Sequence, residues 1–332
     1  MTVKKVLVTG ATGFLGKYVV ERLITEGYEV LALGRNEKAG HDLESLGAIF
    51  CKGDFTNKKE CESYFKDVDY VIHGGALSTV WGSWESFYQA NVEGTRVVCQ
   101  LCQEYKVKKL VYVSSPSIYS AKRHRFDIKE PDYDANNRLN YYIRSKIQSE
   151  QVIREYHDKG LYTVTIRPRG LIGIGDTSLM PRILNANDKI GIPLFNGGEN
   201  YVDITCVENV AYAAFLCLQA EEINGEVFNI TNGEPTQFKV ILEMFLDAIG
   251  KTPRYRKLPF GLVYGAATIL ETIYRVFHIK GEPTLTRYTV CTLAFSQTLD
   301  ISKAKQKLHY SPVITLSEGI EQYGEWWKQN RD

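Results

Sequence analysis

The sequence predicts a doubly wound α/β fold: a mostly parallel sheet with helices on both faces, followed by a smaller, mainly helical C-terminal lobe. Short apolar runs alternate with longer helical patterns through the first half of the chain, which is typical of parallel strands joined by crossover helices. The stretch TGATGFLG lies between the first apolar run and the first helical pattern. Beyond residue 230 the strand rhythm is lost and helical patterns prevail.

The expected strands are short apolar runs bounded by turn residues. They lie at 3–8, 30–33, 48–51, 70–72, 110–113, 164–166 and 227–230. Sequence rich in Gly, Pro and Asn interrupts this rhythm after residue 175. We therefore expect residues 1–175, continued by about 201–230, to form the sheet domain. Residues 176–200 and 231–332 would form the second lobe.

Charge and cysteine content argue against several kinds of partner. The 40 basic and 39 acidic residues give a net charge of +1 without long runs of either sign, so we expect no nucleic-acid partner. The 7 cysteines lack the spacing of a metal site, and we expect no metal. The odd cysteine count and the lack of a signal-peptide pattern predict a cytoplasmic protein.

The longest nearly uncharged stretch begins at Leu258 and continues as an amphipathic pattern to Phe277. Pro259, two glycines and Glu271 make it too short and too broken to span a bilayer. We expect residues 258–277 to line an apolar pocket or the core. A partner surface and a contact with a membrane surface stay open as less favoured alternatives.

The glycines of TGATGFLG suit a phosphate-binding turn. Backbone N–H groups at a helix N-terminus bind the pyrophosphate of a dinucleotide only where no side chain blocks the approach. Gly10 would permit the tight turn, Gly13 the close passage of phosphate, and Gly16 the packing of helix on sheet. An ordinary glycine-rich turn is the alternative. The predicted cofactor-binding residues of this turn are Gly10, Thr12, Gly13, Phe14, Leu15 and Gly16.

The end of the second expected strand favours NADP(H) over NAD(H). An NAD site usually carries Asp or Glu here, whereas this chain has Leu33-Gly34-Arg35-Asn36. The Arg35 guanidinium could pair with the 2′-phosphate of NADP, and no carboxylate immediately opposes it in the sequence. NAD(H) stays open, because Arg35 could be an ordinary surface cation. Asp54, followed by Phe55, could accept a hydrogen bond from adenine or cap a local turn.

Tyr142, Lys146 and Ser115 predict an acid–base site. Four helical residues rotate by about 400°, so Tyr142 and Lys146 share one face of a helix. The ammonium would lower the phenol pKa from about 10 and make Tyr142 useful for proton transfer. Ser115 follows the fifth expected strand, at the edge where open α/β sheets bind ligands. Two exposed helix residues and a capping serine are the alternative.

Further segments carry a resemblance to a known family. They are GDF (53–55), NVEGT (91–95), VYVSSPSIY (111–119), YIRSK (142–146) and RPRGLIGIGD (167–176). With the glycine turn, they resemble the extended short-chain dehydrogenases/reductases over essentially the whole chain, which implies a Rossmann sheet. Other segments are similar to the 3β-hydroxysteroid dehydrogenase branch, which includes bacterial 2-alkyl-3-oxoalkanoate reductases. They are VWGSW (80–84), GGENYVDITCVENVA (197–211), NITNGEP (229–235), GEPTLTRY (281–288) and LDISKAK (299–305).

The resemblance implies roles for the matching residues. Tyr142 would be the acid/base, Lys146 its electrostatic partner and a ribose ligand, and Ser115 a hydrogen-bond partner of the reacting oxygen. Arg167 would be either a contact on the nicotinamide side or a structural ion-pair partner. The other implied cofactor-binding residues are Phe55, His73, Asn91 and Pro168.

The implied activity is NADP-dependent interconversion of a hydrophobic ketone, such as a β-keto acid or a 3-oxosteroid-like compound, and its secondary alcohol. Related sugar-nucleotide epimerases carry an arginine, a tyrosine and a proline where this chain has Val202, Ile172 and Ile174. The aliphatic residues suit an apolar substrate. An NAD-retaining nucleotide-sugar epimerase/dehydratase and a non-catalytic NADP-binding module are the alternatives.

Two tryptophans and two helices bear on the expected partners. Trp81 and Trp84 would contact a small hydrophobic substrate or pack the hinge between lobes. Helices expected at 91–106 and 138–157 could form the contact of a homodimer, as in many members of the resembled family.

Overall fold

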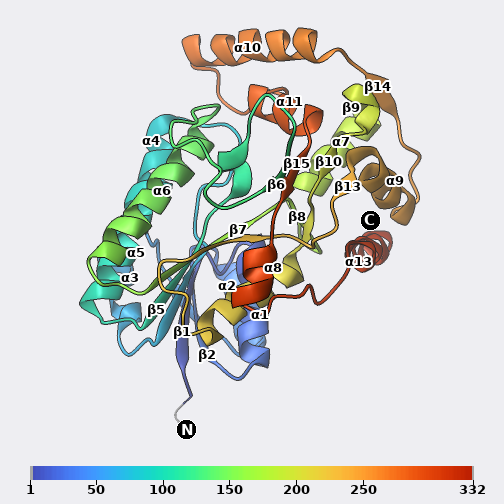
Figure 1. The fold of residues 1–332 in the computed structure, drawn as a ribbon. Coiled ribbons are helices and arrows are strands. Elements are labelled where there is room, and N and C mark those ends of the chain that lie inside the picture. Colours follow the sequence, from blue (N-terminus) through green and yellow to red (C-terminus); the bar gives the residue numbers. More distant parts are fainter. Residues whose placement is uncertain (1–2, 331–332) are drawn as a thin grey trace.

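A seven-stranded parallel sheet forms the centre of the molecule in the computed structural model, which describes residues 3–330 (Figure 1). The strand order is β12-β7-β5-β4-β1-β2-β3. The bounds are β1 Lys5–Thr9, β2 Glu29–Gly34, β3 Ile49–Lys52, β4 Tyr70–His73, β5 Lys109–Val113, β7 Thr163–Pro168 and β12 Val227–Ile230. Each strand coincides with an expected apolar run, so the doubly wound prediction is confirmed.

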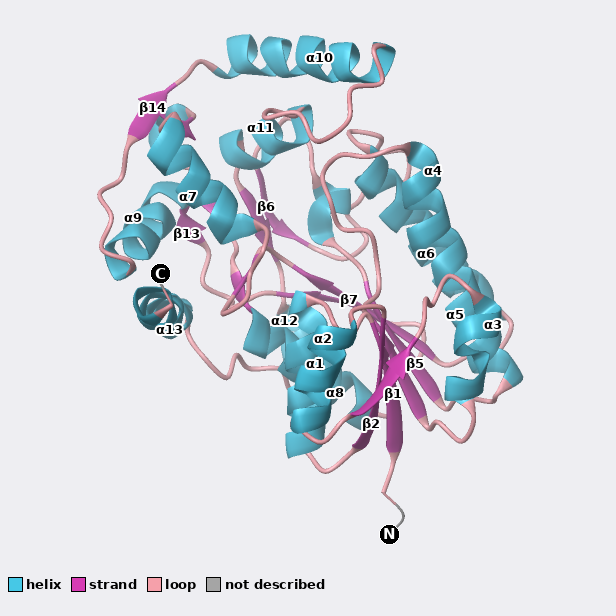
Figure 2. Cartoon of the chain, turned by 180° about the vertical axis from the view of Figure 1, so that it is seen from behind, coloured by secondary structure: helices cyan, strands magenta, loops and turns pink. Residues whose placement is uncertain are grey.

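Helices cover both faces of this sheet (Figures 1 and 2). One face packs against α1 (Phe14–Thr25), α8 (Val207–Gln219) and α12 (Ser302–Lys307). The other packs against α5 (Gly94–Glu104) and α6 (Tyr141–Asp158), which lie side by side. The homodimer contact expected on these two helices stays a prediction. The shorter elements are α2 Glu37–Ser45, α3 Lys58–Cys61, η1 Glu62–Phe65, α4 Trp84–Phe87, η2 Tyr88–Glu93 and η3 Pro116–Tyr119.

The second lobe lies beyond the carboxyl ends of the central strands and is mainly helical, as predicted (Figure 2). Its helical elements are α7 Leu179–Lys189, η4 Asn196–Gly198, α9 Phe238–Ala248, α10 Phe260–Val276, α11 Arg287–Ala294 and α13 Leu316–Gln329. A four-stranded sheet joins β13 (Thr236–Gln237), β10 (Tyr201–Val202), β15 (Gln297–Leu299) and β6 (Arg125–Ile128) in that order. Two small sheets pair β8 (Leu171–Ile172) with β11 (Thr205–Cys206) and β9 (Ile192–Leu194) with β14 (Tyr255–Lys257). Because β6 and β10 come from segments expected in the sheet domain, the chain crosses between the lobes more often than the predicted boundaries imply, and those boundaries stay a prediction.

Helix α10 lies at the outer end of this lobe (Figure 1). One side packs into a small core around Ala267, as expected of residues 258–277. The other side exposes Leu262, Ile269 and Val276 to solvent. No helix within residues 3–330 is long and apolar enough to cross a membrane. A contact of this segment with a membrane surface stays a prediction.

Candidate active site

The glycine turn between β1 and α1 leaves no room for side chains. Gly10 has a φ of +73°, and a Cβ there would lie 2.7 Å from the Cα of Gly75. A Cβ on Gly16 would lie 2.1 Å from the Gly10 carbonyl oxygen. The Gly13 N–H donates to that same carbonyl at 3.0 Å, and α1 begins at the next residue without a side-chain cap. The N-terminus of α1 is therefore open to an anionic ligand, which is the fit that a dinucleotide requires.

The other residues expected at the turn pack against the body of the protein. Thr12 packs against Gly34, where a Cβ would lie 2.5 Å from its side chain. The Phe14 ring lies beneath the loop after β8, 3.5 Å from a Cβ built at Gly173. Leu15 packs on the sheet core, and Pro168 is buried at the end of β7.

The floor of the site is made by Phe55 and His73. The Phe55 ring fills the space left by Gly75 and Gly94, each of which would place a Cβ within 2.6 Å of it. The ring centroids of Phe55 and His73 are 5.2 Å apart. His73 is fully buried at the end of β4, and its expected part in a cofactor site stays a prediction.

The hydrogen bonds of His73 assign its tautomer. The Thr95 hydroxyl donates its one proton to the Asn91 carbonyl at 2.6 Å, so its oxygen accepts from Nε2–H of His73 at 3.1 Å. Nδ1 then accepts from the Thr9 hydroxyl at 2.6 Å. Burial, with a smaller effect of the Lys146 charge, lowers the pKa of His73 to about 3. The ring is neutral and ties β1, β4 and α5 together.

The side-chain amide of Asn91 makes its hydrogen bonds within the protein. Asn91 lies in the π-helical turn η2. Its Oδ1 accepts from the Leu77 N–H at 2.7 Å, and its Nδ2 donates to the Leu77 carbonyl at 3.0 Å and to the Ser145 hydroxyl at 2.9 Å. The residue therefore joins the loop after β4 to α6, one residue from Lys146.

Arg35 has an ionic partner that the sequence interpretation missed. Its guanidinium lies 3.3 Å from Oδ2 of Asp54, although 19 residues separate the two. The parallel pairing of β2 with β3 brings these strand ends together. Asp54 also accepts from the N–H and the hydroxyl of Thr56, at 2.9 and 2.8 Å, which is the local turn role left open above. The Arg35 side chain is 78% exposed, so the pair contributes little to stability.

Ser115 and Tyr142 come together at the end of β5. The Ser115 hydroxyl accepts from the Ser117 N–H at 3.2 Å and donates to the Ser117 hydroxyl at 3.0 Å, and it lies near enough to Tyr142 to affect the pKa of that phenol. The neighbouring Ser114 is not available to a substrate, because its hydroxyl donates to the Glu150 carboxylate. Burial raises the pKa of Tyr142 to about 12, and the nearby Ser115 hydroxyl opposes that rise only in part.

The expected influence of Lys146 on the Tyr142 pKa is absent from this structure. The ammonium donates to the Val113 carbonyl at 2.9 Å and to the Tyr112 hydroxyl at 3.1 Å, so its hydrogen bonds go to β5 rather than to Tyr142. Burial lowers the pKa of Lys146 to about 8. Tyr142 and Lys146 lie one turn apart on a helix, as predicted. The prediction that the ammonium lowers the phenol pKa was wrong.

Glu150 is a site residue that the sequence interpretation missed. Its carboxylate makes a two-pronged ion pair with Arg167, with Nε at 2.9 Å and Nη2 at 2.6 Å from the two oxygens. Arg167 is therefore the structural ion-pair partner, and not the nicotinamide contact, of the two alternatives stated above. The spacing of Tyr142, Lys146 and Glu150 along one helix face was the available signal.

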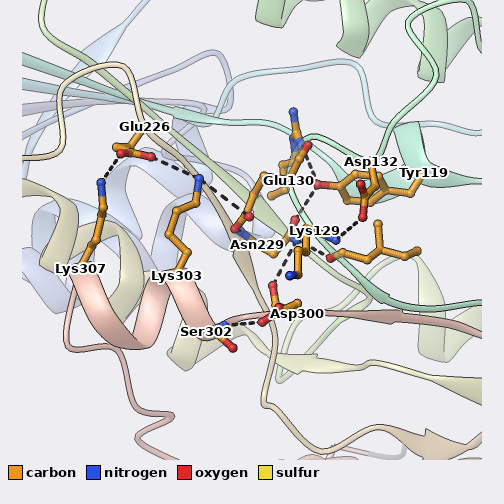
Figure 3. A network of polar contacts seen from close by, with 12 residues as sticks. Tyr119, Lys129, Glu130, Asp132, Glu226, Asn229, Asp300, Ser302, Lys303 and Lys307 are labelled. Atoms are coloured by element: carbon orange, nitrogen blue, oxygen red, sulfur yellow. Dashed lines mark hydrogen bonds and ion pairs between the residues drawn. The ribbon is translucent and has the colours of Figure 1, made fainter.

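A polar network continues from Arg167 to α12, and Figure 3 shows its part from Tyr119 to Lys307. The Tyr119 hydroxyl accepts from Arg167 and donates to Asn229 at 2.7 Å. The backbone N–H of Asn229 in turn donates to the Glu130 carboxylate at 3.0 Å. Lys303 on α12 lies 3.8 Å from Glu130, and Figure 3 shows how Glu226 joins Lys303 to Lys307. This network fixes the sheet edge beside Ser115 to the segments that cover it.

An open glycine turn and a serine–tyrosine pair at the same sheet edge are features of the extended short-chain dehydrogenases/reductases, which are NAD(P)-dependent enzymes. The model of the NAD dependent epimerase/dehydratase family matches residues 6–231. The chain belongs to that family and is an oxidoreductase of this class. The predicted family and enzyme class are confirmed.

Individual relatives are similar over nearly the whole chain. The chain is 33% identical to a 2-alkyl-3-oxoalkanoate reductase of Shewanella oneidensis, covering 96% of this chain and 85% of the relative. It is 32% identical to the decarboxylating sterol-4-alpha-carboxylate 3-dehydrogenase of Mus musculus, covering 96% and 89%. The crystal structure of UDP-glucuronic acid 4-epimerase from Bacillus cereus in complex with NAD has a TM-score of 0.77 at 22% identity over 99% of this chain and 100% of that one. The last similarity concerns the fold alone.

Proposed function

We propose that the protein interconverts a hydrophobic ketone and its secondary alcohol, with NADP(H) as the favoured cofactor. The closeness of the Ser115 hydroxyl to the Tyr142 phenol, at the sheet edge next to the open glycine turn, is the observation that carries this proposal. β-Keto acids are the favoured substrates, because similar proteins include 2-alkyl-3-oxoalkanoate reductases.

The bound cofactor would supply or accept the hydride at the carbonyl carbon. In the reducing direction Tyr142 gives its proton to the ketone oxygen, and Ser115 donates a hydrogen bond to the negative charge that develops there. A phenol with a pKa of about 12 holds its proton at neutral pH, which suits the acid of this direction. Lys146, one helical turn from Tyr142 on α6, would bind the ribose of the cofactor.

The preference for NADP(H) depends on Arg35. Its guanidinium is exposed at the end of β2 and can turn from Asp54 to a 2′-phosphate, which carries more charge than one carboxylate. The nearby Asp54 carboxylate weakens this preference without abolishing it. NAD(H) remains the alternative cofactor.

The epimerase/dehydratase alternative is less favoured because of the residues in the second lobe. Ile172, where related epimerases carry a tyrosine, is fully buried in the lobe core, and Val202 is also buried there. Trp81 lies against Tyr274 of α10, with ring centroids 6.2 Å apart, so an aromatic surface extends from the sheet domain to the lobe. Trp84 instead packs against the inclined ring of Tyr141, with centroids 5.9 Å apart, and against the Arg144 guanidinium 3.7 Å from its ring centroid.

The test is replacement of Tyr142 by Phe, with Tyr141→Phe as the matched control on the neighbouring residue. Tyr142→Phe should keep its fold and its binding of NADPH and should lose at least about 1000-fold in reduction of a 2-alkyl-3-oxoalkanoate, because no other group supplies the proton. Tyr141→Phe should stay within about threefold of the wild type. NADPH and NADH are compared in the same assay, by absorbance of the nicotinamide.

Full activity of Tyr142→Phe would reject its role. Tightly retained NAD without net redox turnover in the wild type would favour the epimerase alternative. Binding of NADPH with no turnover of any ketone would favour a non-catalytic module.

A further inference from the structure

The segment Arg167-Pro168-Arg169 at the end of β7 carries two buried arginines with unequal partners. Burial lowers the pKa of Arg167, but Glu150 more than offsets this, and the net shift is upward. Arg167 also donates to the Glu130 carbonyl at 2.7 Å. Four N–H groups of this first guanidinium thus donate to acceptors inside the protein.

Arg169 is 94% buried as well, since its relative exposure is 6%. Across the described part of the chain, its guanidinium makes a single hydrogen bond, to Oε1 of Gln297, and no ion pair. Asp203 is near enough to raise the pKa of Arg169, yet burial outweighs this and the net shift is downward. A guanidinium has five N–H donors, and Arg169 uses one of them on an acceptor inside the protein, so the arrangement leaves donors for an acceptor that arrives from outside.

The position of Arg169 relates it to the reacting groups. β7 lies beside β5, whose end carries Ser115. Gln297, the one partner of Arg169, donates through Nε2 to the carbonyl of Pro116 at 3.3 Å, next to Ser115.

We propose that Arg169 binds the carboxylate of an oxoacid substrate beside Ser115 and Tyr142. The planar guanidinium matches a carboxylate in a two-pronged geometry, and the buried setting strengthens the pair. The inference rests on the proposed function and narrows it: the substrate is an anionic oxoacid rather than a neutral ketone of the same shape. Arg169 is a specificity residue and takes no part in hydride or proton transfer.

The test compares a 2-alkyl-3-hydroxyalkanoate with its methyl ester, both oxidised by the full-length protein with NADP⁺ or NAD⁺. The wild type should show at least a tenfold higher kcat/KM for the acid. Arg169→Gln should lower kcat/KM for the acid at least tenfold and change that for the ester by less than threefold. Arg123→Gln, which removes an exposed cation of the same region, should leave the acid-to-ester ratio unchanged.

A second variant keeps the test decisive if Arg169→Gln does not fold. Gln297→Glu would give Arg169 a carboxylate inside the protein, so oxidation of the acid should fall while that of the ester persists. Equal kcat/KM for acid and ester in the wild type, or equal losses in the variants, would overturn the role of Arg169 and leave the proposed function intact. Oxidation of neither compound with either cofactor would instead reject the proposed function, and this inference with it.

Discussion

The turn between β1 and α1 and the helix α10 both contain closely spaced glycines, but the two sets have opposite physical settings. A Cβ on Gly16 would lie 2.1 Å from a carbonyl oxygen, whereas a Cβ on Gly261 or Gly265 would meet no atom within 4 Å. The first set is required by close packing and the second is tolerated on an open surface. Glycine spacing acquires functional meaning only from what surrounds it.

The largest expected effect tests whether α10 really has one packed and one open side. Ala267→Glu would place a charge in the core around Ala267 and should lower the free energy of unfolding by about 3–5 kcal/mol. Ala266→Glu, one residue away on the exposed side, should change it by less than about 0.5 kcal/mol. Chemical denaturation measures both. Equal losses in the two variants would mean that the exposed side of α10 is covered in solution.

The next effect concerns the two glycine sets directly. Gly16→Ala forces its new methyl group against backbone and should cost about 3 kcal/mol, with loss of NADPH binding. Gly265→Ala, inside a helix with free space, should instead raise the free energy of unfolding by about 0.5–1 kcal/mol. Thermal unfolding with and without NADPH measures both, and a stable, NADPH-binding Gly16→Ala protein would contradict the close packing of the turn.

The smallest effect is a pH dependence from His73, under the glycine turn. The pKa of His73 falls to about 3 on folding from its ordinary value of about 6.5, so folding is opposed by protonation. The stabilisation of the folded state by a neutral His73 is fully present above pH 6.5 and is lost as the pH falls from there towards 3. His73→Gln cannot take up this proton, so between pH 7 and pH 4 it should lose about 1–3 kcal/mol less than the wild type. Urea titrations at the two pH values measure the free energy of unfolding of both proteins. Equal losses in the wild type and in His73→Gln would exclude a buried neutral histidine.

The sequence predicted the sheet well because strand and helix patterns are local. All seven central strands follow from apolar runs of a few residues, and α6 brings Tyr142 and Lys146 to one face through its period alone. Ser115 was chosen among neighbouring serines from its place after the fifth expected strand and from the family resemblance. The structure adds the physical reason, because Ser114 is occupied by Glu150.

Pairings over long separations were outside the reach of sequence patterns. The ion pair of Arg35 with Asp54 depends on which strands are neighbours. The pKa of Tyr142 depends on burial, and the hydrogen bonds of Lys146 depend on how α6 packs on β5. None of these is encoded in the spacing of two residues along the chain.

By itself, the sequence determined the order of strands and helices along the chain, the place of the glycine turn and the candidates for the reactive side chains, because each follows from a period or motif within a few residues. Only the tertiary structure decided that Arg167 has a carboxylate partner, while Arg169 in the same tripeptide has a single amide acceptor. It also decided which side of α10 is buried. Those outcomes depend on partners up to 128 residues away, and a chain folds such partners together only through the packing of the whole molecule.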